Sequence, residues 1–180
     1  MKLFLTLFLF DILLGFVLQA AGCTVLLYTV TRQRLKSRSF LLTAIIFTAI
    51  AIIVRLICNY GLINFGFHTV LIWLIFVIVA ILYNKFPTLQ STVSILLSGM
   101  LIAIAEILTG VALTLILGKE KFNAIMDNTA TIEGQILRAK CGMPANILFL
   151  VLVLAIHMII SHRRVRPARD NNVTGEDATA

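Results

Sequence analysis

Charged residues are scarce in this chain, and acidic ones are scarcer still. Charged side chains make up 13% of the 180 residues, against 60% that are hydrophobic, whereas soluble proteins carry about 25% charged residues. Several apolar runs also exceed the roughly 18 residues that indicate a bilayer-spanning helix. This composition excludes an ordinary soluble domain. We therefore expect an integral, multi-pass protein of the cell membrane.

Residues that bind metals or catalyse reactions are few, and their spacing suits neither purpose. The chain has three cysteines and three histidines, none with the spacing of a metal site or a redox motif. A membrane peptidase needs a nucleophile and a base within reach of each other. Cys58 and His68 flank one turn but lack a third residue to orient them. We expect no metal, no cofactor and no enzymatic activity.

The apolar runs predict an all-α fold, an integral membrane bundle of five transmembrane helices. Their expected bounds are 3–30, 40–63, 66–84, 91–118 and 144–162, so that residues 1–164 form one domain. Pro144 suits the first turn of the fifth span, where a missing N–H costs nothing. Gly99 and Gly110 are expected at close helix contacts, and His157 is interpreted as a core histidine bonded to a neighbouring helix. Residues 165–180 have little to bury and predict a disordered cytoplasmic tail.

Basic residues gather at the ends of the apolar runs. The formal net charge of +7 therefore suits anionic lipid head groups better than nucleic acid. Five spans place nine basic residues on one side and five on the other, so the positive-inside rule predicts an outside N-terminus and a cytoplasmic C-terminus. The cytoplasmic nine are Arg32, Arg34, Lys36, Arg38, Lys85, Arg163, Arg164, Arg166 and Arg169.

The outer segment 119–143 has apolar residues at helical spacing and charges on the opposite side. This pattern predicts one or two short amphipathic helices on the outer interface. The segment is interpreted either as a structural lid over the bundle or as a contact for a ligand or peptide. Its apolar positions are Phe122, Ile125, Met126, Thr129, Ile132, Ile136 and Leu137.

Three charges lie inside the apolar runs: Asp11, Arg55 and Glu106. Arg55 and Glu106 each follow the start of their span by fifteen residues, about 22 Å, so their depths match. A cation in a membrane helix costs at least about 2.5 kcal/mol and needs a partner. We expect the two side chains to face inward together. The full predicted set, called here the outer polar cluster, is Asp11, Arg55, Asn59, Tyr60, His68 and Glu106.

Three interpretations of the outer polar cluster stay open. It can be a structural ion cluster that fixes helix register, a ligand pocket between helices, or part of a proton or ion path. The layout resembles the N-terminal membrane sensor region of multi-pass histidine kinases of Gram-positive bacteria. The resemblance rests on Arg55 late in the second run, the turn with Gly66, His68 and Thr69, and Glu106 in the fourth run.

Two features depart from that family. Its turns often carry a proline before the glycine, where this chain has Asn64 and Phe65, and no phosphoacceptor or ATP-binding domain follows Arg169. The resemblance therefore implies a sensor-like module without a kinase domain, which signals to a separate cytoplasmic partner or works as a homo-oligomer. The alternatives are a substrate-binding subunit of a small-molecule transporter and a structural or assembly protein. The absence of an inverted repeat and of a sixth span counts against the transporter.

Overall fold

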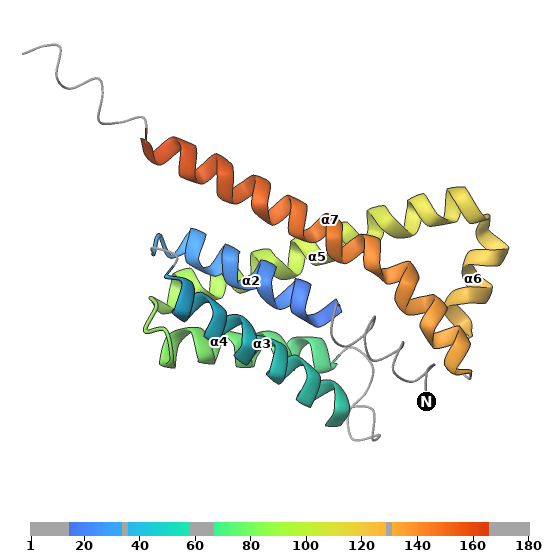
Figure 1. The fold of residues 1–180 in the computed structure, drawn as a ribbon, viewed down its shortest axis with the longest axis horizontal. Coiled ribbons are helices and arrows are strands. Elements are labelled where there is room, and N and C mark those ends of the chain that lie inside the picture. The colour runs from blue at the N-terminus through green and yellow to red at the C-terminus, as the bar shows by residue number, and fades with distance from the viewer. Residues whose placement is uncertain (1–14, 34–35, 58–66, 129–130, 166–180) are drawn as a thin grey trace, which may run out of the picture.

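The computed structural model describes residues 15–33, 36–57, 67–128 and 131–165, and this part of the chain consists of helices joined by short connections (Figure 1). The predicted all-α class is confirmed for these residues, which contain no strand. The described helices are α2 (Phe16–Val30), α3 (Ser37–Ile57), α4 (Phe67–Leu82), α5 (Thr88–Leu117), α6 (Lys119–Asp127) and α7 (Ile132–Val165).

Three stretches are long and apolar enough to cross a bilayer: Ser37–Val54, Thr88–Leu117 and Ile132–His162. They lie in α3, α5 and α7, at the second, fourth and fifth predicted spans. The apolar helices Phe16–Val30 and Val70–Leu82 are shorter than a span, and the predicted bounds of the first and second spans run into residues outside the described part. A membrane-protein class is supported, while the count of five stays a prediction.

The start of α7 differs from the prediction. Pro144 was expected in the first turn of the last span, but it lies inside α7, which begins at Ile132. The hydroxyl of Thr131 accepts a hydrogen bond from the backbone N–H of Gly134 at 3.1 Å, which is the usual N-cap contact. The cap and the helical pattern that follows start the helix before the proline, although an interior proline removes one backbone hydrogen bond and its ring crowds the carbonyl of the preceding turn.

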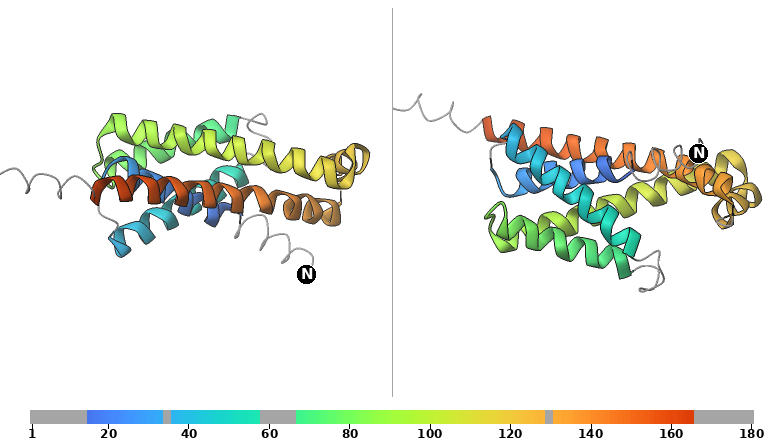
Figure 2. Two further views of the ribbon diagram at one scale, coloured as in Figure 1. Left: turned by 90° about the horizontal axis from the view of Figure 1, so that it is seen from above. Right: turned by 60° about the horizontal axis from the view of Figure 1, so that its bottom comes forward.

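The helix α2 lies at the centre of the arrangement. It packs against α3, α5 and α7, while α4 packs against both α3 and α5. Views from two further directions show α5 and α7 running side by side beyond the other helices, where α6 joins their ends (Figure 2). At about 1.5 Å per residue, α5 and α7 are about 45 and 51 Å long.

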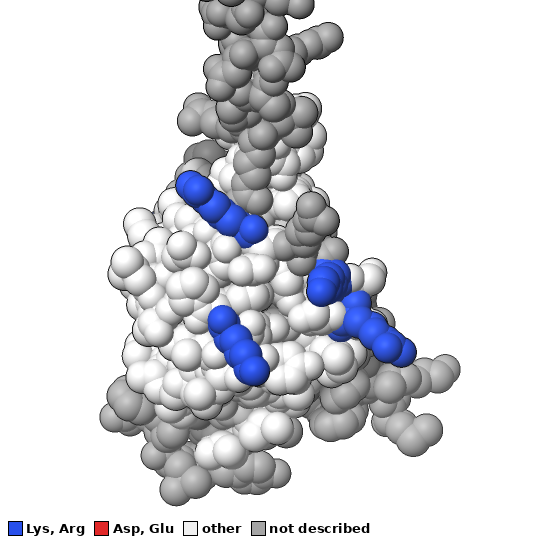
Figure 3. All heavy atoms as spheres, turned by 90° about the vertical axis from the view of Figure 1, so that its left-hand side faces the viewer, with Lys and Arg blue, Asp and Glu red and all other residues white. Residues whose placement is uncertain are grey.

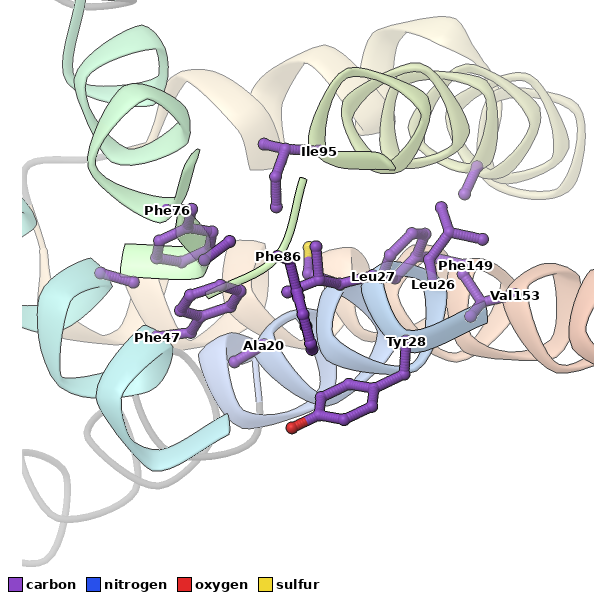
Figure 4. Packing of buried hydrophobic residues seen from close by; sticks show 14 residues of the cluster. Ala20, Leu26, Leu27, Tyr28, Phe47, Phe76, Phe86, Ile95, Phe149 and Val153 are labelled. Carbon is purple, nitrogen blue, oxygen red and sulfur yellow. The ribbon is translucent and has the colours of Figure 1, made fainter. Parts of the chain in front are cut away.

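The core forms where α2 meets its neighbours (Figure 4). Phe47 of α3 stacks on Phe76 of α4 with ring centroids 4.0 Å apart and an interplanar angle of 5°. On the other side of α2, Phe149 of α7 is 1% exposed and lies over Gly22. Burial of these aromatic side chains fixes how the helices slide along one another.

The two predicted glycine contacts on α5 have opposite outcomes. A Cβ atom added at Gly99 would lie less than 3.0 Å from three atoms of the Trp73 ring, so the close contact predicted there is confirmed. The prediction for Gly110 is wrong, because no atom lies within 4 Å of a Cβ added there. Of these two glycines, Gly99 alone faces a large side chain of a neighbouring helix.

A network of polar side chains links the C-terminal ends of α2 and α4 to the N-terminal end of α3. The hydroxyl of Tyr28 lies 2.6 Å from the Ser39 hydroxyl and 3.5 Å from Asn84 Oδ1. The Thr43 hydroxyl donates to the same Asn84 oxygen at 3.0 Å. We expect Tyr28→Phe to lower the free energy of unfolding by about 1 kcal/mol, because the hydrogen bonds are lost while the ring remains.

This prediction is checked by denaturation in mixed micelles followed by circular dichroism. The matched control is Tyr83→Phe at the same end of the bundle, where the side chain is exposed and a change within about 0.5 kcal/mol is expected. Equal losses in the two variants would show that the Tyr28 network does not stabilise the fold.

Candidate functional site

The described part of the chain covers half of the outer polar cluster. Asp11, Asn59 and Tyr60 lie outside the described residues. The helical backbone at Arg55 in α3 and at His68 in α4 is described, without their side chains. Glu106 in α5 is described completely. The levels of these three residues follow from the contacts that fix the register of α3, α4 and α5.

The stacked rings of Phe47 and Phe76 fix the register between α3 and α4. The two helices follow one another through a single connection and run antiparallel (Figure 1). Arg55 lies eight residues after Phe47, and His68 lies eight residues before Phe76. Both positions are therefore about 12 Å from the stacked rings, in the same direction. The backbones of Arg55 and His68 lie at one level.

The contact between Trp73 and Gly99 fixes the register between α4 and α5 in the same way. Phe67, the first residue of α4, lies six residues before Trp73, and Glu106 lies seven residues after Gly99. At 1.5 Å per residue these positions are about 9 and 10 Å from the contact. Glu106 therefore lies level with the N-terminus of α4.

Glu106 also lies on the face of α5 that carries α4, because seven residues make nearly two full helical turns from Gly99. Its side chain is nevertheless exposed, in contrast to the inward-facing position predicted from the sequence. The reason is that α4 begins only at Phe67, so its described residues end where they would start to cover Glu106. The N-terminal end of a helix favours a nearby carboxylate.

The helix α4 stands between the two charges predicted to pair. It packs against both α3 and α5, whereas α3 packs mainly against α2 and α4. The C-terminal ends of α3 and α5 run apart in Figure 1. Arg55 and Glu106 thus share a level on two sides of the α4 N-terminus. Their direct pairing stays a prediction, since the Arg55 side chain is outside the described part.

Two polar contacts join α2 to α7, and of these the sequence analysis missed the one between Gln19 and Asn146. The Gln19 amide donates to Asn146 Oδ1 at 2.8 Å, and the Thr29 hydroxyl lies 2.8 Å from His157 Nδ1. Because that hydroxyl donates its hydrogen to the Val25 carbonyl at 2.6 Å, Nδ1 must be the donor to Thr29. The predicted interhelical bond of His157 is confirmed. The residue numbers of the bonded partners increase together along both helices, so α2 and α7 run parallel.

The outer segment contains one separate amphipathic helix. In α6, Phe122, Ile125 and Met126 are half-buried while the charged residues are exposed, as the helical spacing predicted. This helix packs against α5 and α7 and lies at the far end from α3 and α4 (Figure 1). It therefore closes the α5–α7 hairpin and is not a lid over the whole bundle.

Known proteins give no further guide to the site. No family model, no curated protein and no solved structure matches this chain. Among the described residues, no group of three or more His, Cys, Asp or Glu side chains is placed to hold a metal ion.

Proposed function

We propose that this protein is a sensor- or receptor-like membrane module with five spans, an outside N-terminus and a cytoplasmic C-terminus. A ligand binds from the outside at the outer polar cluster and shifts the packing of the helices. The observation that carries the proposal is the shared level of Arg55, His68 and Glu106 around the N-terminus of α4. An exposed carboxylate in an apolar helix marks a functional site by default.

Three further observations support the five spans and their orientation. The sequence before α2 is apolar over most of residues 3–14, enough to lengthen α2 into a span, and the apolar residues after Ile57 continue the second predicted span to residue 63. The described connections α2–α3 and α4–α5 lie at one end of the bundle (Figure 1). Their basic residues favour the cytoplasmic side.

The helix α7 provides the route for a signal. It runs without interruption from Ile132 to Val165, from the outer segment to the end where the basic connections lie. Its contacts with α2 through Gln19 and Thr29 make the two helices move as a pair. A ligand changes their position only if it binds one packing state more tightly than the other.

The chemistry of the cluster defines the probe. A guanidinium and a carboxylate at one level complement a solute that carries both charges, such as an amino acid or a short peptide. The test adds glycine or trialanine to the protein in lipid nanodiscs and follows backbone hydrogen exchange by mass spectrometry. We expect slower exchange at residues 55–70 and altered exchange at the inner end of α7, both absent in Glu106→Gln and Arg55→Gln.

The matched control is Glu120→Gln, which removes an exposed carboxylate from α6 and should respond like the wild type. No response to either probe in the wild type, or an unchanged response in both cluster variants, would contradict a binding site for such solutes. Accumulation of radiolabelled probe inside proteoliposomes would instead indicate the transporter alternative.

A further inference from the structure

One end of the molecule carries basic side chains and no acidic ones among the described residues (Figure 3). This surface, called here the basic end, comprises four exposed residues in the α2–α3 and α4–α5 connections and the first turn of α3: Arg32, Lys36, Arg38 and Lys85. The opposite end mixes both signs, with Lys119, Lys121, Arg138 and Lys140 beside Glu120, Asp127 and Glu133. Among the described residues, the basic end therefore attracts anions without competition from neighbouring carboxylates.

The basic end borders exposed apolar strips that continue along the helices. Along the chain, Lys85 lies between Leu82, which is 73% exposed, and Leu89, which is 77% exposed. Arg38 is followed along α3 by the exposed Leu41 and Leu42. An amphiphile matches both parts, because its anionic head meets the cation while its acyl chain lies along the strip. A free anion or a soluble acidic protein would use only the cation.

The backbone is strained at two of the four cations of the basic end. Arg32 and Lys85 both have φ of +55°, a left-handed conformation that costs a residue with a side chain roughly 1 kcal/mol or more. Arg32 donates its N–H to Thr29, and the following Gln33 donates to Tyr28, which is the helix-ending pattern where glycine is usual. Strain of this kind is retained where the side chain has a function.

The connections that carry the basic end are also fixed to one another. Ser39, next to Arg38, bonds to Tyr28, and Asn84, next to Lys85, accepts from Tyr28 and Thr43. The backbone at Arg38 and Lys85 is therefore held in place by these hydrogen bonds. This lowers the entropy lost when the two side chains bind a charged group.

We propose that the basic end binds the phosphate of anionic phospholipids, with one head group at Lys85 and its acyl chain along Leu82 and Leu89. This inference is independent of the outer polar cluster, because the described positions Arg55, His68 and Glu106 lie away from the basic end along the same helices. The lipid recognised is defined by its negative head group, as in phosphatidylglycerol.

The test measures binding of phosphatidylglycerol and phosphatidylcholine to the purified full chain in detergent by native mass spectrometry. We expect the wild type to prefer phosphatidylglycerol, and the preference to fall about fivefold for each cation removed in Lys85→Gln and Arg38→Gln. Higher salt should weaken the preference. Equal affinity for the two lipids in the wild type would overturn the proposal.

Two further variants separate charge from folding. Lys85→Gly relieves the left-handed backbone, so it should fold at least as stably as the wild type yet lose the preference. The double variant Lys119→Gln with Lys121→Gln removes two cations at the opposite end and should retain the preference for phosphatidylglycerol. If that control loses the preference equally, or inorganic phosphate displaces the lipid completely, the basic end is not a lipid site.

Discussion

Gly99→Val should lower the free energy of unfolding by about 3 kcal/mol, the upper part of the range for overpacking a closely packed site. The Trp73 ring occupies the space into which any side chain at Gly99 would extend. A rigid indole cannot yield as a flexible chain end does, so α4 and α5 must separate. Denaturation in mixed micelles, followed by circular dichroism, measures the loss.

The same helix offers a matched control at Gly110. No atom lies within 4 Å of a Cβ added there, so Gly110→Val should change stability by less than about 1 kcal/mol. Trp73 is the one tryptophan of the chain, and its fluorescence should change in Gly99→Val and not in Gly110→Val. Equal losses in both variants would show that helix propensity, and not the contact with Trp73, causes the effect.

The contact between Trp73 and Gly99 has a consequence for the outer polar cluster. It sets the register that brings Glu106 level with the first turn of α4. If Gly99→Val pushes α4 away from α5, the space beside Glu106 changes as well. We therefore expect this variant to alter any response that depends on the cluster, although Gly99 lies about 10 Å from Glu106 along the helix.

Hydropathy predicted the positions of most helices because burial in lipid depends mainly on composition. The amphipathic character of α6 followed from spacing in the same way. Pro144 misled the prediction of where α7 begins, since a rule for helix starts was applied to a position that the helix passes through. The capping residue Thr131, thirteen residues before the first residue of the predicted span, was the missed signal.

The depth of Arg55 and Glu106 could be estimated from the sequence, because it depends only on counting residues along each helix. The order of helices around the bundle could not. That α4 stands between α3 and α5, and that α2 runs parallel to α7, results from packing between residues far apart in the chain. Gln19 and Asn146, separated by 127 residues, could therefore not be paired in advance.

The same limit applies to the two glycines of α5. Gly99 and Gly110 look alike in sequence, and both lie in an apolar helix. Whether a glycine marks a close contact depends on what faces it from the neighbouring helix, and only Gly99 faces an aromatic ring. Residue type predicted a close helix contact at both positions, but the position of α4 produces one only at Gly99.

Phe149→Ala should lower the free energy of unfolding by about 3–5 kcal/mol, the range for removing a buried aromatic side chain. Phe149 is 1% exposed and packs over Gly22 at the parallel contact between α2 and α7. The control Met158→Ala changes an exposed residue of the same helix and should cost less than about 1 kcal/mol. Both are measured by denaturation in mixed micelles.

A double-mutant cycle tests whether the fit between ring and glycine is the cause. Gly22→Ala adds a Cβ atom less than 3.0 Å from the Phe149 ring and should destabilise the protein alone. Combined with Phe149→Leu, it should cost less than the two single changes predict, because the smaller side chain leaves room for the methyl group. Strict additivity would mean that α2 and α7 adjust independently at this contact. In that case movement of α2 would not be transmitted to α7 through their interface, and the proposed route of the signal would have to run through α5.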